Sequence, residues 1–280
     1  MVAVVAVPWS ARPAGAIAHG ADAADGDYPF SVLLTMTGLP GAGGGTRDSS
    51  CSGALIAPRW VITAGHCFRD AAGRRVSRTV AERTTAVVGR TDLGDPDGQE
   101  ADVVAAYQAG GADVALAELG EPVTGITPIR VATQPPERGE VLRLTGFGLV
   151  TDGGGTAPAT RLQTGLFTVD AIGDAVIETS GRAPRRDTSP CPHDSGGPYF
   201  RENRDRTFVL MAVVSSGPGC PHTGPELSAR VDNLGDWITG TVATAPHGPA
   251  YARDALLLTA GMAVLLVAGV VLRRRAGGRR

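Results

Sequence analysis

The sequence lacks lysine, has few aromatic residues and contains only four cysteines. All 26 basic residues among the 280 are arginine. GC-rich codon usage explains this bias better than any ligand does, so we assign it no function. Aromatic residues make up 5% of the chain, so a core must be filled mainly by valine, leucine, alanine and isoleucine. The 39 glycines and 20 prolines are typical of a loop-rich protein and remain below the content of low-complexity sequence.

Clustered positive charge and helical periodicity are also missing from most of the chain. The formal net charge is −2, and five arginines follow residue 272, so the preceding chain is acidic. Nucleic-acid binding depends on clustered cations that face phosphates, so we exclude a nucleic-acid partner. Runs rich in valine, leucine, isoleucine and threonine, such as residues 31–35 and 208–214, alternate with breaks rich in glycine and proline. This spacing predicts an all-β domain, sandwich or barrel, with a short helix starting within residues 231–239.

Three short segments carry residue types that together support nucleophilic catalysis. They are residues 63–67 (Thr-Ala-Gly-His-Cys), 113–116 (Asp-Val-Ala-Leu) and 194–198 (Asp-Ser-Gly-Gly-Pro). A serine hydroxyl is a weak nucleophile at neutral pH unless an imidazole takes its proton, and that imidazole needs a carboxylate to fix its tautomer. We therefore interpret His66 as the base, Asp113 as the carboxylate and Ser195 as the nucleophile.

The order of His66, Asp113 and Ser195 separates this chain from hydrolases that use the same chemistry on other folds. The three segments and their neighbours, from residues 17–20 (Ile-Ala-His-Gly) to residues 231–238 (Val-Asp-Asn-Leu-Gly-Asp-Trp-Ile), resemble the chymotrypsin-like (trypsin-like) serine peptidases. The resemblance implies two packed antiparallel six-stranded β-barrels followed by a short C-terminal helix. It also implies hydrolysis of polypeptide substrates through an acyl-enzyme, without a cofactor or metal.

The resemblance places a protease domain at residues 17–240. Barrel one would span about residues 17–125 and barrel two about residues 126–240, with the boundary near residues 124–128. We expect a single catalytic unit with a segment appended at each end.

The first 16 residues have features of an export signal. The start is apolar, and an A-x-A pattern ends at Ala16, although the apolar start is not preceded by the basic residues of a usual signal. Cleavage there would expose the amine of Ile17. The resemblance implies that this amine pairs with Asp194 and thereby builds the oxyanion site. We expect signal peptidase itself to produce the active form, whereas a competing cleavage pattern would start the chain at His19.

Residues 255–272 predict a transmembrane helix. These 18 consecutive residues carry no charge, and a helix of that length covers about 27 Å, enough for a bilayer core. Arginines follow directly, which predicts that residues 273–280 form a cytoplasmic tail and that the protease domain lies outside the cell. Residues 241–254 would be the tether. A buried globular helix is the alternative interpretation of the apolar segment.

Four cysteines in an exported chain suggest two disulfides, with three connectivities open. The resemblance selects Cys51 with Cys67 and Cys191 with Cys220. Because Cys191 and Cys220 each begin a Cys-x-His unit, an alternative is a zinc site that uses both units. The acidic residues within 92–100 do not match the register of a calcium-binding loop, and we interpret them as a solvated turn.

The resemblance assigns the oxyanion hole to the backbone N–H groups of His193 and Ser195. Histidine stands here where the family usually has glycine, at a position that requires a positive φ. We expect the His193 side chain to point to solvent with the hole intact. The alternatives are a flipped, inactive peptide and a hole that forms only when substrate binds.

The resemblance assigns Ser189, Ser215, Ser216, Gly217 and Glu226 to substrate binding. Ser189 stands where strict cleavers after arginine or lysine carry aspartate, and Ser216 replaces the usual tryptophan. A carboxylate from Glu226 inside the pocket would favour a cationic partner. We therefore expect a preference for basic residues, or a mixture of basic and large apolar residues, before the scissile bond (position P1). The alternative is that Glu226 points outward or fills the pocket.

Two further expectations concern residues without an evident role. His19, His222 and His247 have no partner that the sequence reveals, so we expect them at the surface. The substitutions at His193 and Ser216 leave a second function open, a binding or scaffold protein with a catalytically impaired protease fold. The sequence identifies neither a protein inhibitor nor an assembly partner.

Overall fold

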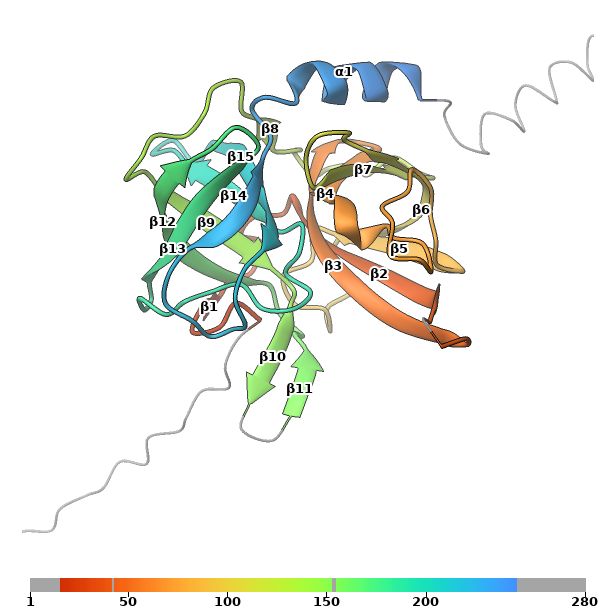
Figure 1. Cartoon of the computed structure of the whole chain (residues 1–280), viewed down its shortest axis with the longest axis horizontal. Coiled ribbons are helices and arrows are strands. Elements are labelled where there is room, and N and C mark those ends of the chain that lie inside the picture. The colour runs from red at the N-terminus through yellow and green to blue at the C-terminus, as the bar shows by residue number, and fades with distance from the viewer. Residues whose placement is uncertain (1–15, 42, 153–154, 246–280) are drawn as a thin grey trace, which may run out of the picture. The chain divides into compact units, whose positions relative to one another are not determined.

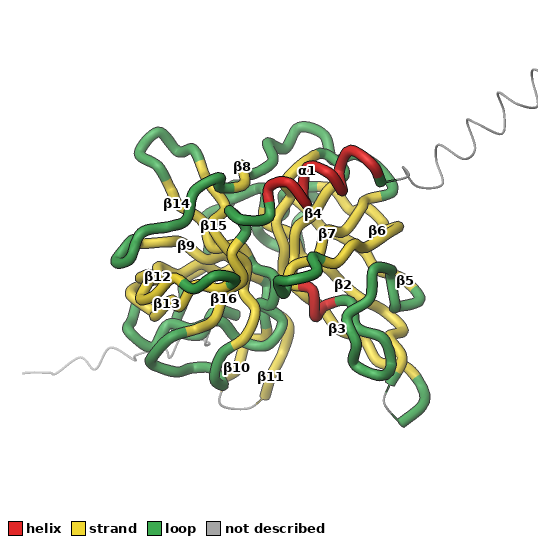
Figure 2. Tube along the Cα trace, turned by 45° about the horizontal axis from the view of Figure 1, so that its top comes forward, coloured by secondary structure: helices red, strands yellow, loops and turns green. Residues whose placement is uncertain are grey.

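The computed structural model describes residues 16–41, 43–152 and 155–245. Within this part of the chain, strands and loops account for nearly everything apart from one α-helix and one short 3-10 helix (Figure 2). The all-β class expected from the sequence is therefore confirmed. None of the helices in these three ranges is long and apolar enough to span a bilayer. The expected membrane segment at 255–272, the tail at 273–280 and all but the last residue of the expected signal lie outside the described residues.

Barrel one is a closed antiparallel sheet in the order β2-β3-β4-β7-β6-β5 (Figure 1). Its strands are β2 (Ser31–Pro40), β3 (Thr46–Ala57), β4 (Trp60–Ala64), β5 (Arg83–Val88), β6 (Gln99–Gln108) and β7 (Val114–Leu119). Alternate residues of a strand face opposite sides of the sheet. Accordingly Val32, Leu34 and Met36 of β2 point into the barrel and are buried, whereas Leu33 and Thr35 between them are partly exposed.

Barrel two closes because β9 pairs with both β12 and β14. Its six strands are β9 (Val141–Gly146), β12 (Gln163–Ile172), β13 (Val176–Ala183), β14 (Pro198–Glu202), β15 (Phe208–Ser216) and β16 (Glu226–Arg230). Two short strands join it at its sides, β1 (Ala21–Asp22) on β12 and β8 (Arg130–Val131) on β15. A separate hairpin consists of β10 (Leu149–Asp152) and β11 (Gly155–Pro158). The two six-stranded barrels implied by the resemblance are thus present.

The N-terminal segment belongs to barrel two, which corrects the expected start of barrel one at residue 17. Ala18 and Ser189 exchange two backbone hydrogen bonds of 2.9 and 3.2 Å. Strand β1, which follows, pairs with β12 of the same barrel. The side chain of Ile17 is 0% exposed and lies in the hydrophobic core of barrel two. Barrel one begins only at Ser31, because the residues before β2 find their strand partner on the other sheet. The connection between the barrels, residues 120–129, includes the expected boundary.

The C-terminal helix starts within the expected range of residues 231–239 but ends later than expected. Helix α1 (Gly235–Thr244) extends into the expected tether at 241–254. Residues 231–234 form a turn before it, in which the N–H of Leu234 donates to the carbonyl of Val231. Asp236 in the first turn suits the positive end of the helix dipole.

A cluster of aromatic side chains joins the two barrels. Four of the few aromatic residues, Tyr28, Phe30, Phe200 and Phe208, form one cluster of edge-to-face and tilted rings with centroids 5.2–6.3 Å apart. Such pairs add to the stabilisation from burial alone. Phe30 directly precedes β2, and its carbonyl accepts from the N–H of Leu55 in β3 over 2.8 Å. Because Phe200 and Phe208 belong to β14 and β15, the cluster packs this edge of barrel one against barrel two.

Candidate active site

Strand pairing in barrel one brings His66 and Asp113 together. Strands β4 and β7 are antiparallel, with Ala64 opposite Val114. His66 lies in the 3-10 helix η1 (Gly65–Cys67) directly after β4, and Asp113 directly precedes β7, so both lie at the same end of this strand pair. The backbone N–H of His66 donates to Asp113 Oδ1 over 2.9 Å, and His66 Nδ1 lies 2.7 Å from Asp113 Oδ2.

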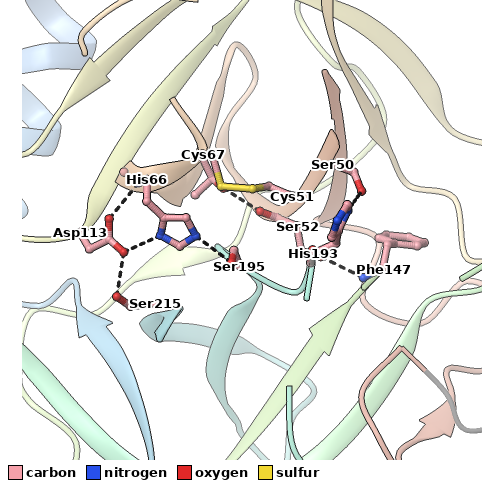
Figure 3. The surroundings of a disulfide bond; sticks show 12 residues. Ser50, Cys51, Ser52, His66, Cys67, Asp113, Phe147, His193, Ser195 and Ser215 are labelled. Carbon is pink, nitrogen blue, oxygen red and sulfur yellow. Dashed lines mark hydrogen bonds and ion pairs between the residues drawn. A yellow bond between two sulfur atoms is a disulfide. The ribbon is translucent and has the colours of Figure 1, made fainter. Parts of the chain in front are cut away.

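Ser195 reaches His66 from barrel two. The loop before β14 is tied to β15 by a hydrogen bond from the N–H of Gly196 to the carbonyl of Val214, 2.8 Å long. Gly196 has φ +82°, and a Cβ there would collide with Thr63 of barrel one, so only glycine fits. The loop thereby places Ser195 Oγ 2.8 Å from His66 Nε2, and the three side chains follow one another in Figure 3.

The charge of Asp113 determines which ring nitrogen of His66 carries the proton. Burial opposes its ionisation, but hydrogen bonds from His66 and from the Ser215 hydroxyl outweigh burial and hold the pKa of Asp113 at about 2. An ionised carboxylate only accepts hydrogen bonds, so His66 Nδ1 donates to it and Nε2 is left as the acceptor for the Ser195 O–H. The arrangement is ready to take the proton of Ser195.

Two backbone amides of the nucleophile loop are left without an acceptor in the described part of the chain, those of His193 and Ser195. The amides of Cys191, Asp194 and their neighbours on the loop are all hydrogen-bonded. The carbonyl of Pro192 accepts from the N–H of Leu149 over 2.8 Å, which fixes the peptide bond that carries the His193 amide. The geometry therefore leaves two donors beside Ser195 Oγ.

His193 has the positive φ expected of this position, +77°, but its side chain does not point to solvent as we expected. Its Nδ1 lies 2.6 Å from Ser50 Oγ, and Figure 3 shows the ring directed toward Ser50. Burial, assisted by the charge of Arg47, lowers the pKa of His193, so the ring is neutral. The Ser52 hydroxyl donates to the His193 carbonyl over 3.3 Å and accepts from the N–H of Phe147. Barrel one thus holds His193 by both its side chain and its backbone.

Asp194 is fully buried and has no cationic partner among the described residues. Its carboxyl accepts the N–H groups of Gly148 and Cys191, each over 2.9 Å. Burial raises the pKa of Asp194 to about 8 against the effect of these two bonds, and the charge of Glu226 raises it further. Ile17 is still joined to residue 16 here, so its nitrogen is a neutral peptide amide. A cation beside Asp194 would lower the pKa of this carboxyl group and so favour its ionised form.

A cavity of about 190 Å³ opens beside Ser195 and contains the expected substrate-binding residues except one. Residues 215–217 and Glu226 line it, but Ser189 does not. Ser189 is buried behind the wall, where its hydroxyl accepts from the N–H of His222 over 3.2 Å. A cavity of about 150 Å³ holds a benzene ring, so this one has room for a single substrate side chain.

His222 is not a surface residue, contrary to the expectation from the sequence. Its ring is 10% exposed and its Nε2 is hydrogen-bonded to Glu226 Oε1, whose side chain is 4% exposed. Glu226 therefore faces the cavity with a histidine partner. His19 has an acidic neighbour, Asp187, at 3.2 Å, and His247 lies outside the described residues.

Both disulfides selected by the resemblance are present, Cys51 with Cys67 and Cys191 with Cys220. The zinc alternative is wrong, because the disulfide between Cys191 and Cys220 uses the thiolates that would bind the metal. The first disulfide joins β3 to η1 and so holds the segment that carries His66 (Figure 3).

Three of the four acidic residues at 92–100, Asp92, Asp95 and Asp97, lie in a turn as expected from the sequence, whereas Glu100 belongs to β6. Asp92 accepts from the N–H of Gly94 over 2.8 Å and pairs with Arg161 at 2.6 Å. In the described ranges these acids do not gather into a group that could hold a metal ion.

Sequence reasoning missed two residues that support the His66–Asp113 pair. Arg75 donates to the carbonyl of Ala112 over 2.5 Å and lies 3.5 Å from Asp113 Oδ1. The amide of Gln108 donates to the carbonyl of Gly65 over 2.8 Å. Neither residue belongs to a motif, so no sequence signal distinguishes Arg75 from the other arginines.

The model of the Trypsin family matches residues 17–238. Chymotrypsin-like elastase family member 3B of Homo sapiens is 28% identical over 85% of this chain and 93% of its own length. A trypsin-like protease of Streptomyces glaucescens is 28% identical over 79% of this chain and 83% of its own length.

A third relative is much longer than this chain. The serine proteinase stubble of Drosophila melanogaster is 28% identical over 83% of this chain, but the match spans only 32% of stubble. The shared region is again the one that contains His66, Asp113 and Ser195. The family match over most of the chain, together with these residues in hydrogen-bonding contact, shows that the protein belongs to the trypsin family and is a serine-type endopeptidase.

Proposed function

We propose that this chain is an exported, membrane-anchored endopeptidase that hydrolyses polypeptides through an acyl-enzyme on Ser195. The observation that carries the proposal is the position of His66, which is hydrogen-bonded at one ring nitrogen to Asp113 and at the other to Ser195. This arrangement supplies a base, its orienting carboxylate and a nucleophile in one line.

Acylation follows from this geometry. His66 Nε2 takes the proton of the Ser195 hydroxyl as Oγ bonds to the substrate carbonyl carbon, and negative charge develops on the carbonyl oxygen. The amides of His193 and Ser195 donate to that oxygen, and one such donor typically contributes a factor of about 10² to 10³ in rate. Protonated His66 is stabilised by Asp113 and gives its proton to the leaving amine. The peptide bond breaks, and the acyl group remains on Ser195 as an ester.

Deacylation repeats these steps with water. His66 takes a proton from the water as its oxygen attacks the ester carbon. The same two amides stabilise the developing charge, and the proton then returns to Ser195 Oγ as the acid product leaves. Each residue ends the cycle in its starting protonation state.

The buried Asp194 supports a role for the amine of Ile17. Asp194 has a raised pKa and no cation beside it in the part of the chain that the structure describes, and the side chain of Ile17 already lies in the core of barrel two. Cleavage after Ala16 would convert the Ile17 nitrogen into a cation that ionises Asp194 and steadies the nucleophile loop. We propose signal peptidase as the enzyme that makes this cut. Amino-terminal sequencing of the mature protein tests the proposal, and a start at His19 contradicts it.

Location is proposed from the sequence alone. The uncharged residues 255–272 followed by arginines favour a membrane anchor with the protease domain outside the cell. Fractionation of cells that express the full chain or residues 1–254 tests this. The full chain is expected with the membranes and the shortened chain in the medium, and recovery of both in one fraction contradicts an anchor.

Polypeptides are the proposed substrates, with a basic or a mixed basic and large apolar preference at P1. The cavity beside Ser195 admits one side chain, and its wall contains the carboxyl group of Glu226. A chromogenic ester tests the reaction itself. We expect a burst of about one equivalent of released alcohol per enzyme before steady turnover, the kinetic sign of an acyl-enzyme, and its loss in Ser195→Ala. No burst in the processed wild type would favour the impaired scaffold instead.

A further inference from the structure

Glu226 in the wall of the substrate cavity is paired with the buried ring of His222. Three residues separate the two along the chain that leads into β16, and His222 Nε2 is hydrogen-bonded to Glu226 Oε1. The other oxygen, Oε2, lies against Gly217, where a Cβ would collide with it. Gly217 and Glu226 both line the cavity beside Ser195. A substrate side chain in the cavity therefore meets a carboxyl group that already has a partner on its far side.

His222 is held in this position by contacts other than Glu226. Its backbone N–H donates to the hydroxyl of the buried Ser189, and Cys220 two residues earlier is fixed by its disulfide to Cys191. The ring is thus fastened against the carboxyl group by the same loop that closes the cavity.

We propose that His222 sets the net charge of the substrate cavity and is thereby a specificity-determining residue of this endopeptidase. The inference deepens the proposed P1 preference and rests on the proposed function. Glu226 and His222 act as one unit. The number of protons on the pair therefore determines whether the cavity prefers a cationic or a neutral P1 side chain.

The number of protons on the pair gives the sign of the pH effect, whichever of the two side chains carries each proton. With two protons the pair carries +1, with one proton it is neutral, and with none it carries −1. The charge of the cavity wall therefore decreases at each step as the pH rises. A cationic P1 side chain gains relative to a neutral one at each step, because only the cation interacts with the changing charge.

Two other titratable groups face Glu226, and neither reverses this sign. Asp194 of the nucleophile loop interacts electrostatically with Glu226, and so does Tyr199 of β14, whose burial raises its pKa well above the ordinary value. Tyr199 therefore stays neutral. Asp194 is either protonated or, in the processed chain, neutralised by the amine of Ile17. Burial also raises the pKa of Glu226, which favours retention of a proton on the pair.

Removal of the imidazole has a defined consequence. A pair with two proton sites loses its last proton at a pH no lower than the one at which the carboxyl alone would lose its own. In His222→Gln the cavity therefore reaches its negative charge at a lower pH than in the wild type. Glutamine keeps a donor for Glu226 but cannot titrate.

The test compares two peptide substrates that differ only at P1, arginine in one and norleucine in the other. The ratio of their kcat/KM values is measured from about pH 5 to pH 8, the interval in which histidine side chains usually change charge. Any effect of pH on the catalytic steps common to both substrates cancels in the ratio. We expect the ratio to rise about tenfold or more with pH in the wild type, to rise at lower pH in His222→Gln, and to be independent of pH in the double variant His222→Gln/Glu226→Gln, in which neither side chain of the pair can titrate.

The outcomes separate this inference from the proposed function. A wild-type ratio that does not change with pH overturns it, and so does a pH-dependent ratio that persists in the double variant. If the variants at His222 do not fold, Glu226→Gln decides, because its pair goes from +1 to 0 and never becomes negative. Its ratio at high pH must therefore stay below that of the wild type, and an equal ratio there overturns the inference. Hydrolysis of both substrates with an ester burst leaves the proposed function standing in either case. Failure of the burst and of all hydrolysis in the processed wild type overturns the proposed function, and this inference with it.

Discussion

At the scale of single residues, catalytic competence depends on hydrogen bonds that fix His66 from both sides. Asp113 accepts from the backbone and the ring of His66 and from the hydroxyl of Ser215. These bonds keep the pKa of Asp113 at about 2 against the cost of burial. Asp113 therefore remains ionised throughout the pH range in which a peptidase works, and the tautomer of His66 does not change.

Replacement of Asp113 by asparagine tests this role. The amide would favour the wrong tautomer of His66, so Nε2 would no longer accept the proton of Ser195. We expect kcat to fall by about 10⁴ with little change in KM, the loss known for the same change in a related triad. Steady-state kinetics measure it. Ser215→Ala removes one bond to the same carboxylate and should cost far less, whereas a loss below tenfold in Asp113→Asn contradicts the account.

His193 is held in a conformation that glycine adopts without strain. A non-glycine residue at φ +77° is unfavourable, and the bond from its ring to Ser50 keeps it there. We expect Ser50→Ala to lower kcat by about three- to tenfold, since a net hydrogen bond contributes about 0.5–1.5 kcal/mol. The measurement is kcat at saturating substrate together with the affinity for a transition-state analogue that carries an oxyanion.

The matched control for this prediction is His193→Gly. Glycine needs no side-chain anchor, so Ser50→Ala should have no effect on kcat in that background. A double-mutant cycle gives the coupling between the two positions. Equal losses in both backgrounds would show that Ser50 does not act through His193.

At the scale of elements, the paired strands β4 and β7 fix the two ends from which His66 and Asp113 project. The disulfide between Cys51 and Cys67 adds a second restraint, because it joins β3 to η1. The nucleophile loop approaches from the other barrel and is bonded to β3 through the N–H of Ser52 and the carbonyl of Ser195, 2.9 Å apart. Strand β3 thus positions both halves of the site.

The double replacement Cys51→Ala/Cys67→Ala tests the contribution of this disulfide. Its sequence separation is 16, and the chain-entropy model gives about 3 kcal/mol for a loop of that size. We expect the free energy of unfolding to decrease by about this amount. Equilibrium unfolding in urea measures the change, and an undiminished free energy of unfolding would refute the prediction.

Sequence patterns predicted the elements that local chemistry specifies. Runs rich in valine, leucine, isoleucine and threonine predicted strands such as β2, and the motif around Ser195 predicted the nucleophile loop. The start of the helix was predicted within residues 231–239 and lies at Gly235. Its extension to Thr244 was not predicted, because Thr241, Val242 and Thr244 are weak helix formers. The N-terminal segment was assigned to the wrong barrel, since its partner β12 lies more than a hundred residues away and strand propensity does not specify a distant partner.

The candidate site shows the same division between local and distant information. His66, Asp113 and Ser195 were found because each lies in a distinctive segment. The Ser50 partner of His193 and the support from Arg75 were not, because both depend on contacts across the fold. His222 was missed although its partner is only four residues away, because its burial results from the loop around Ser189 and Cys220.

At the scale of the whole molecule, the N-terminal segment connects the chain end to the nucleophile loop. Ile17 packs in barrel two, Ala18 is bonded to Ser189, and Asp194 is a buried acid without a cation among the described residues. The proposed cleavage after Ala16 would therefore be expected to change the electrostatics of the loop that carries Ser195.

Stability against pH tests this electrostatic state in the chain that retains residue 16. The folded-state pKa of Asp194 is raised to about 8, so the folded protein binds a proton that the unfolded chain has lost above about pH 4. Stability must then decrease as the pH rises from about 4 to about 8. We expect the free energy of unfolding to be lower at pH 8 than at pH 5 by a few kcal/mol, since one unit of pKa difference corresponds to about 1.4 kcal/mol.

Asp194→Asn in the same uncleaved chain is the control. Its amide does not titrate, so most of the pH dependence should disappear. The chain that begins at Ile17 should also lose most of it, because the amine ionises Asp194. An identical decrease in all three proteins would assign the effect to other groups.

The most direct measurement of the central claim is covalent labelling of the processed protein by a fluorophosphonate, with the adduct located by mass spectrometry. If His66 activates Ser195 within the hydrogen-bonded line to Asp113, about one label per molecule is expected, on Ser195, and His66→Ala should label far more slowly. Equal labelling rates in the wild type and His66→Ala, or no adduct on Ser195, would contradict the account.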